Sequence, residues 1–152
     1  MNIWDMHCDA LSKMLMESDI RFDADPRLDV TAERLRLGRV QLQAFAIYIP
    51  ESWRGRPFDA VLESIDKFNR VIGRRDDFLP IRSKKDLETL LQPGERRIGA
   101  LLTLEGVDGL EGNLAFLRIV HELGVRTVGI TWNYANWAAD GVREKRGGGL
   151  TR

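Results

Sequence analysis

Two kinds of metal-binding side chain alternate near the amino terminus, in the stretch WDMHCDAL. If this stretch is an extended strand, His7 and Asp9 point to the same face, with about 6.6 Å of backbone rise between them. A nitrogen and an oxygen could then meet at one divalent cation. Trp4, Met6 and Cys8 would face the other way, into apolar packing. An ordinary strand end with a satisfied core histidine gives the same pattern, so the spacing alone leaves both interpretations open.

Other polar side chains follow later apolar runs. The run IGALLTLEG predicts a buried strand that ends at Glu105, and a carboxylate there is costly to bury unless it is paired or metal-bound. The run VRTVGITW predicts a strand that ends at Trp132, with Asn133 next. Active sites of α/β barrels and open α/β sheets form at the carboxyl ends of the strands. We therefore expect these residues to share one edge with His7 and Asp9.

The elements that must position these residues alternate between strand and helix. Helical spacing of apolar residues and helix caps predict helices at 10–17, 58–72, 84–92 and 113–124, with Ser83 as the cap of the third and Gly124 just after the last. Apolar runs predict strands at the amino terminus and at 40–49, 96–106 and 125–132. This order predicts parallel βαβ units and not a sandwich.

The number of strands indicates an incomplete barrel. Four strand–helix units fill the 152 residues, whereas a closed (β/α)₈ barrel needs about 250. The chain stops at the glycine-rich RGGGLTR. The predicted fold class is therefore α/β: the N-terminal half of a (β/α)₈ TIM barrel, in one domain over residues 1–152. Such a half-barrel exposes a strand edge and an apolar face, so we expect a homo-oligomer.

Composition excludes several classes of partner. The chain has 23 basic and 23 acidic side chains, which gives no electrostatic bias toward nucleic acid or an anionic membrane surface. No apolar run approaches the length that spans a bilayer, and the start lacks the features of a signal peptide. One cysteine excludes an internal disulfide framework. We expect a cytoplasmic protein that binds neither nucleic acid nor membrane.

Metal chemistry accounts for these residues together. Zn²⁺ accepts imidazole nitrogen and carboxylate oxygen, and a catalytic site keeps one position open for water. His7 and Asp9 would hold one ion, and Glu105 could bridge it to a second. Two ions about 3.5–4 Å apart can share a hydroxide and polarise a substrate carbonyl.

The same residues lie in segments that resemble the membrane (renal) dipeptidase family of zinc peptidases, in the amidohydrolase superfamily of metal-dependent barrels. These segments are WDMHCDAL, GRVQLQAFAIYIP, TLEGVDGLEGNLAFLRIVHELGVRTVGITWNYANWAADG and GLTR. The resemblance implies that His7 and Asp9 bind the first zinc and that Glu105 bridges both. It also implies hydrolysis of dipeptides, with Glu105 as a catalytic ligand. We expect Trp132 and Asn133 to line the pocket and bind the substrate.

Two departures from the family pattern qualify this assignment. Many members have a histidine near the scissile carbonyl where this chain has Trp132, which follows Thr131. The two histidines of the second zinc, and the arginine and aspartate that handle substrate and proton, belong to the family's second half. We therefore expect an N-terminal fragment that has little or no activity alone. The alternatives are a superfamily hydrolase of another amide or a lactone, and a non-catalytic half-barrel module for binding or assembly.

We expect the remaining polar residues near these segments to have structural roles and not to take part in chemistry. Asp5 shares the face of His7 but lies deeper, so it is expected to support the site. Cys8 is expected to be a packing residue, and His121 a solvated residue near a helix end. Asp108 and Glu111 are expected to cap the helix that starts near Asn113. The segment RGRP is expected to be solvated surface, and the aromatic residues of TWNYANW belong either to the core or to a pocket wall.

Overall fold

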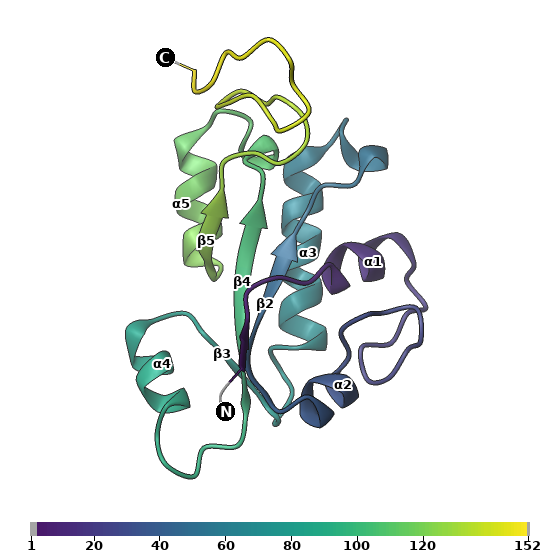
Figure 1. The fold of residues 1–152 in the computed structure, drawn as a ribbon, viewed down its shortest axis with the longest axis vertical. Helices are drawn as coiled ribbons and strands as arrows, with labels where there is room; N and C mark the ends of the chain where they lie inside the picture. The colour runs from purple at the N-terminus through teal and green to yellow at the C-terminus, as the bar shows by residue number, and fades with distance from the viewer. Residues whose placement is uncertain (1–2, 152) are drawn as a thin grey trace.

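The fold is an α/β arrangement of parallel strands with helices packed around them (Figure 1). A computed structural model describes residues 3–151. The elements, in chain order, are β1 (Ile3–Asp5), α1 (Ala10–Met16), α2 (Ala32–Leu37), β2 (Val40–Ile47), η1 (Glu51–Trp53), α3 (Pro57–Val71), β3 (Phe78–Pro80), α4 (Lys84–Leu90), β4 (Ile98–Glu105), η2 (Asp108–Leu110), α5 (Leu114–Glu122) and β5 (Val125–Gly129).

One five-stranded parallel sheet contains every predicted strand and one more. The order is β1-β2-β4-β3, and β5 also pairs with β4. β3 pairs with the start of β4, at Ile98–Ala100, and β5 pairs with its end, at Leu102–Glu105. The prediction of about four parallel strands is therefore confirmed with one addition, because β3 is too short to show a pattern in the sequence.

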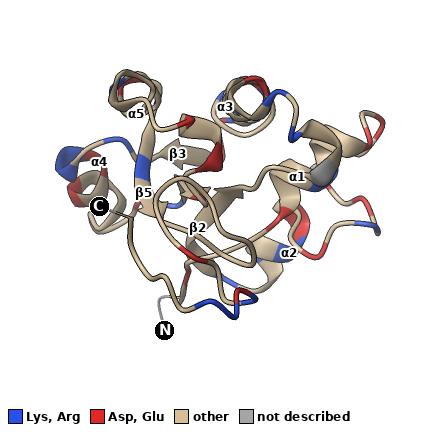
Figure 2. Ribbon diagram, turned by 90° about the horizontal axis from the view of Figure 1, so that it is seen from above, with Lys and Arg blue, Asp and Glu red and all other residues tan. Residues whose placement is uncertain are grey.

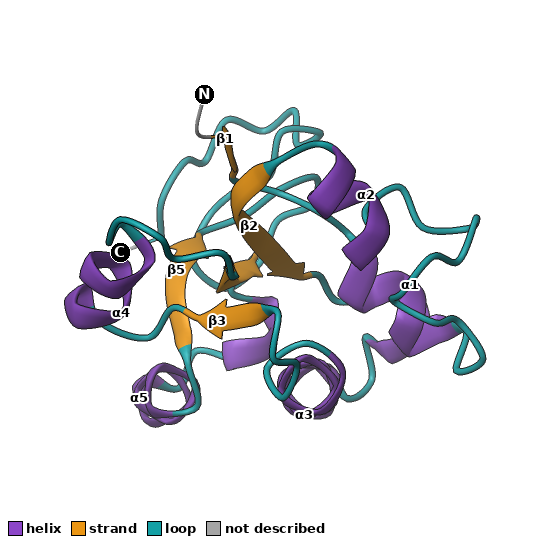
Figure 3. Cartoon of the chain, turned by 90° about the horizontal axis from the view of Figure 1, so that it is seen from below, coloured by secondary structure: helices purple, strands orange, loops and turns teal. Residues whose placement is uncertain are grey.

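Two apolar clusters lie on opposite faces of β2 and β4. The larger includes Phe45 and Ile47 with Leu102 and Leu104, and the helices α1 and α3 also contribute to it. The smaller contains Leu42, Ala44 and Leu101 together with Ile81 and Leu90 near α4. Because successive strand residues point to opposite faces, the two sets alternate along β2. Figure 3 shows the helices arranged around the strands.

Local signals set the helix boundaries largely as predicted. Ser83 Oγ accepts a hydrogen bond from Asp86 N at the start of α4, at 3.2 Å. Asn113 Oδ1 accepts one from Ala115 N at the start of α5, at 2.9 Å. Gly124 follows α5 with φ of +119°, a conformation that favours glycine. The helix α2, which Thr31 caps, was not predicted.

Burial on the first strand differs from the expectation. Cys8 is buried, as predicted, but the prediction that Trp4 and Met6 pack in an apolar core is wrong, since they are 45% and 53% exposed. Among the described strands β1 pairs only with β2, so one edge and part of a face stay open to solvent. Trp4 Nε1 instead donates a hydrogen bond to Gln41 Oε1 at 2.9 Å.

Apolar side chains are also exposed at the opposite edge, on α5, on β5 and on the residue that follows β5. They include Leu114, Leu117, Ile119, Val128 and Ile130. In the view from above, ribbon segments of basic and of acidic residues are interspersed around the periphery (Figure 2). None of the helices within residues 3–151 has both the length and the apolar character of a membrane-crossing segment.

Candidate metal centre and adjoining pocket

The three predicted metal ligands come together at the edge where the strands end. His7 and Asp9 follow β1, and Glu105 is the last residue of β4, with β2 paired between these two strands. One donor atom from each residue lies within 4.8 Å of the other two. The convergence arises differently from the expectation, because β1 ends at Asp5 and the two ligands lie beyond it.

The distances suit a single zinc ion. Zinc–nitrogen and zinc–oxygen bonds of about 2.0–2.2 Å in tetrahedral geometry place neighbouring donors about 3.4 Å apart. His7 Nε2 is 3.5 Å from Asp9 Oδ2 and 4.0 Å from Glu105 Oε2. An imidazole and two carboxylates are a donor set that zinc binds, and they leave a fourth position open. The residues present therefore fit the metal that the sequence analysis implies.

The backbone of Asp9, and not its side chain, begins the following helix. Asp9 occupies the N-cap position of α1, and its carbonyl accepts hydrogen bonds from Lys13 N at 3.1 Å and Ser12 Oγ at 3.0 Å. Aspartate commonly caps helices with its carboxylate, but this carboxylate makes no capping hydrogen bond. The carboxylate of Asp9 is therefore not used as a helix cap. Its Oδ2 atom lies near His7 Nε2 and can serve as a metal ligand.

The backbone of His7 is held from two sides. Its amide donates to Asp5 Oδ1 at 3.2 Å, and its carbonyl accepts from Gln43 Nε2 at 3.2 Å. Gln43 is fully buried and also donates to the carbonyl of Ala44 at 3.0 Å. Asp5 therefore supports the loop that carries His7, in agreement with the prediction.

Burial distinguishes Glu105 from the other two candidate ligands. Its side chain is 24% exposed, whereas those of His7 and Asp9 are each 51% exposed. Burial raises the pKa of Glu105; nearby His7 opposes this rise and the Asp9 carboxylate adds to it. A carboxylate with this environment is stabilised by a bound cation.

The neighbouring residue Cys8 does not have the lowered thiol pKa of a reactive cysteine. Burial raises the pKa of the Cys8 thiol to about 12. Since the thiolate is the reactive form, this thiol is inert at neutral pH. Cys8 is a packing residue, as predicted.

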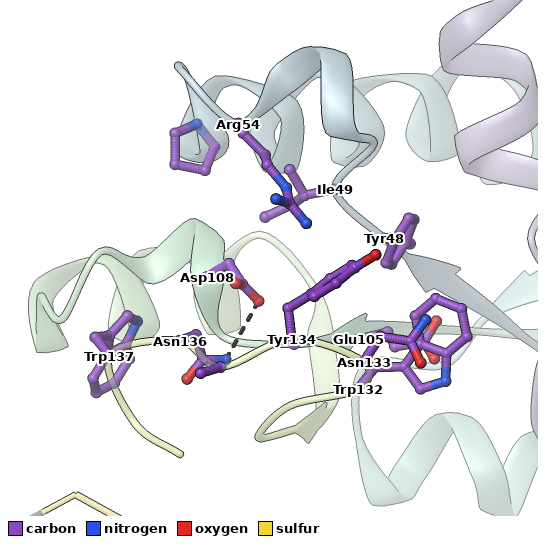
Figure 4. Close-up of a pocket in the computed structure, with 13 residues that line it drawn as sticks. Tyr48, Ile49, Arg54, Glu105, Asp108, Trp132, Asn133, Tyr134, Asn136 and Trp137 are labelled. Atoms are coloured by element: carbon purple, nitrogen blue, oxygen red, sulfur yellow. Dashed lines mark hydrogen bonds between the residues drawn. The ribbon is translucent and has the colours of Figure 1, made fainter. Parts of the chain in front are cut away.

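A pocket of about 360 Å³ adjoins the candidate metal centre, with Glu105 as part of its wall (Figure 4). The predicted substrate-contacting residues Trp132 and Asn133 also line it. Trp132 packs edge-on against the ring of Tyr48, with centroids 5.4 Å apart. Tyr134 and Trp137 line the pocket too, so the aromatic residues of TWNYANW form a pocket wall. Glu105 thus belongs to both the donor cluster and the pocket.

A long loop after β5 holds this wall in place. The carbonyls of Trp132 and Asn133 accept hydrogen bonds from Val142 N at 2.7 Å and Arg143 N at 2.9 Å. A Cβ atom on Gly141 would lie 2.4 Å from the carbonyl carbon of Asn133. Only glycine permits this close backbone approach. The loop lies above the ends of β4 and β5 in Figure 1.

Several residues of the pocket wall were not identified from the sequence, and Tyr48, Arg54 and Asp108 are examples. Tyr48 follows β2 by one residue, and its place at a strand end is the signal that would have found it. Arg54, of the segment RGRP, is exposed as expected but also lines the pocket. Asp108 lines it as well, so the prediction that Asp108 caps the later helix is wrong. Asn113 caps that helix instead.

Comparison with known proteins agrees with this geometry. A sequence model of the family "Membrane dipeptidase (Peptidase family M19)" matches residues 1–152. A protein of Aspergillus oryzae called dipeptidase aclJ is 34% identical over 128 residues, which are 78% of this chain and 30% of that protein. Dipeptidase 3 of Rattus norvegicus is 30% identical over 129 residues, which are 82% of this chain and 25% of that protein.

Solved structures share the fold. The crystal structure of a dipeptidase AC, a metallopeptidase of family M19, has a TM-score of 0.82 at 20% identity and covers 93% of this chain. A metallopeptidase from Rhodobacter sphaeroides, liganded with a phosphinate mimic of L-Ala-D-Ala, has a TM-score of 0.79 at 18% identity. The chain covers 46% and 48% of these two proteins. It has the parallel α/β fold of part of their TIM barrels, and it spans about a quarter to a third of the curated relatives.

Proposed function

Since the chain belongs to the membrane dipeptidase family, peptidase family M19, we propose that it supplies the first metal site and part of the substrate pocket of a zinc-dependent dipeptidase. The observation that carries this proposal is the meeting of His7, Asp9 and Glu105 within 4.8 Å at the strand ends. Glu105 is distant in the sequence from His7 and Asp9, and the donor types of the three residues are those of a catalytic zinc site.

The three residues have separate roles in this proposal. His7 and Asp9 would hold one ion, and Glu105 would contact the same ion from the side of the pocket. A bound zinc ion polarises a substrate carbonyl and lowers the pKa of a coordinated water. Glu105 has two carboxylate oxygens and belongs to both the donor cluster and the pocket wall, which supports the proposal that it would also bind a second ion.

The pocket supplies substrate contacts. Its volume of about 360 Å³ lies within the range of small-molecule sites. Asn133 offers an amide that can donate to a peptide carbonyl or accept from a peptide N–H. Trp132 offers an apolar face, which its packing against Tyr48 orients. Trp132 cannot exchange a proton as a histidine would, so we assign it to shape and not to proton transfer.

We further propose that residues 1–152 alone bind zinc weakly and hydrolyse dipeptides poorly. Three donors complete one site at most, and the chain covers under half of the solved relatives. An extended protein, with the additional length found in these relatives, would supply the ligands of a second ion.

The test measures zinc content and hydrolysis of L-Ala-L-Ala for both the 152-residue chain and the extended protein. We expect full activity only in the extended protein, and loss of zinc and activity in Asp9→Asn. The matched control is Asp66→Asn, which alters an exposed carboxylate paired with Arg70 on α3. Full activity of the short chain would refute the proposal for that chain. An extended protein that cleaves lactones or other amides, but no dipeptide, would refute the proposed reaction.

A further inference from the structure

The first candidate ligand lies where the chain separates from its neighbouring strand. Asp5 is the last residue of β1 and lies opposite Gln43 of β2 in the parallel register. Contact with β2 resumes at Cys8, whose carbonyl accepts a hydrogen bond from Ala46 N at 3.0 Å. His7 lies in the interval, beyond the last register pair of β1 and β2. The regular pairing of these two strands therefore does not hold its backbone.

The side chain of Gln43 holds this stretch from inside the core. Its Nε2 atom donates to the carbonyls of His7 at 3.2 Å, Asp5 at 3.4 Å and Ala44 at 3.0 Å. The two N–H groups of one amide thus serve three carbonyls at the point where β1 ends. Gln43 is fully buried, and hydrogen bonds in such a low-dielectric environment are stronger than those in water.

The carbonyl end of the same amide has no such role. Gln43 Oε1 is buried and has no hydrogen-bond partner within residues 3–151. An unsatisfied buried acceptor lowers stability, and an apolar side chain of similar length avoids that cost. The contribution of this amide therefore lies in the bonds that Nε2 donates, two of which end on the stretch that carries His7.

Support of the backbone matters at His7 because packing does not enclose its side chain. The side chain is 51% exposed, and its Nε2 atom lies 3.5 Å from Asp9 Oδ2 and 4.0 Å from Glu105 Oε2. A metal site requires its donors to be held within about 0.5 Å of the productive geometry. For a ring that is half exposed, the direction of the Cα–Cβ bond decides whether Nε2 meets the other donors, and the backbone sets that direction.

Resting on the proposed function, we propose that Gln43 is a positioning residue of the metal centre. Its buried amide fixes the peptide group after His7, and Asp5 Oδ1 fixes the one before it by accepting from His7 N at 3.2 Å. The imidazole is thereby held where Asp9 and Glu105 can share an ion with it. Gln43 itself contacts neither metal nor substrate in this proposal. Groups that orient metal ligands in this way raise the affinity for the metal.

The experiment replaces Gln43 by methionine, which keeps the length of the side chain and removes both the N–H donors and the unpaired oxygen. Calorimetry on the 152-residue chain should give a zinc Kd about tenfold weaker, the lower end of the range for groups that hold metal ligands. In the metal-free chain, ¹⁵N relaxation should show the order parameter of the His7 amide falling from about 0.85 to below about 0.6. A role in folding alone would lower the urea midpoint but leave the Kd of the folded chain unchanged.

Gln41→Met is the matched control, since it makes the same replacement two residues earlier on β2. Gln41 Oε1 accepts a hydrogen bond from Trp4 Nε1 at 2.9 Å, near the start of β1 and away from His7. This variant should keep both the zinc affinity and the order of the His7 amide. The same loss in Gln41→Met as in Gln43→Met would overturn the proposal.

Gln43→Asn is a second variant, and it decides the question if Gln43→Met does not fold. It keeps an amide but shortens the side chain by one methylene, so Nε2 no longer reaches the carbonyl of His7. We expect a similar loss of zinc affinity and of order. Unchanged values in the Gln43 variants would refute the positioning role.

These results separate the positioning role from the proposed function. Equal zinc binding by the unmodified chain and by Gln43→Met refutes the role of Gln43 and leaves the proposed function intact. If the unmodified chain binds no zinc, the proposed function fails, and the relaxation measurement still tests whether Gln43 holds His7. An unchanged order parameter in Gln43→Met would then refute that role as well.

Discussion

Replacing Glu105 by glutamine is expected to remove most of the stability that zinc gives to the folded chain. The substitution preserves size but exchanges a carboxylate for a neutral amide, which is a weaker zinc ligand. His7 and Asp9 remain, so only one of the three donors within 4.8 Å is altered. The change in zinc-dependent stability therefore measures the contribution of Glu105 to the metal centre.

The magnitude follows from the coupling of binding to folding. Zinc at 100 times its dissociation constant, bound only by the folded state, adds about 2.7 kcal/mol to the free energy of unfolding. For a chain of 152 residues this raises Tm by roughly 5–11 °C. A 100-fold loss of affinity, the upper end of the range for residues that merely support metal ligands, leaves about 0.4 kcal/mol, or roughly 1–2 °C.

The zinc-dependent rise in Tm of the unmodified chain and of Glu105→Gln is measured by thermal unfolding followed by circular dichroism, at fixed free zinc and again with a chelator. Glu122→Gln is the matched control, since Glu122 is an exposed carboxylate on α5 outside the donor cluster. This control should show the full zinc-dependent rise in Tm. An equal rise in the unmodified chain and in Glu105→Gln would refute the assignment of Glu105 as a ligand.

Without metal, the Glu105→Gln substitution should raise the free energy of unfolding instead of lowering it. Burial raises the pKa of Glu105, so between its unfolded and folded pKa values the folded state binds more protons. The free energy of unfolding of the unmodified chain therefore falls as the pH rises through this interval. The Glu105→Gln variant has no carboxylate at this position, so its free energy of unfolding does not fall for this reason. In urea titrations with a chelator, the advantage of Glu105→Gln should grow from pH 4 to pH 8. A difference that stays constant with pH would contradict the argument.

Three further predictions concern the core, a helix cap and the buried thiol. Phe45→Ala should lower the free energy of unfolding by about 3–5 kcal/mol in urea, because Phe45 is fully buried with two other rings at 5.7 Å. Asn113→Ala should cost about 1 kcal/mol in the same assay through loss of the α5 cap. Cys8 should resist a thiol reagent at pH 8 until urea unfolds the chain, since its pKa is about 12.

Local signals in the sequence determined most of the elements. The apolar spacing of α3 and the caps of α4 and α5 depend on residues only a few positions apart, so they can be read without knowing the fold. The polar residues that follow β1 and that end β4 could likewise be placed at one edge, because parallel strands end on the same side. Strand ends alone thus predict that His7, Asp9 and Glu105 lie at a common edge.

The tertiary structure decided what local patterns do not contain. The three residues of β3 become a strand only through pairing with β4, and Trp4 is exposed because β1 has one strand partner among the described residues. Arg54 looks like any surface cation in the sequence, and it reaches the pocket only because the loop after β2 brings it to Tyr134. Periodicity and capping are set by near neighbours along the chain, whereas exposure and pocket membership depend on partners that only folding brings together.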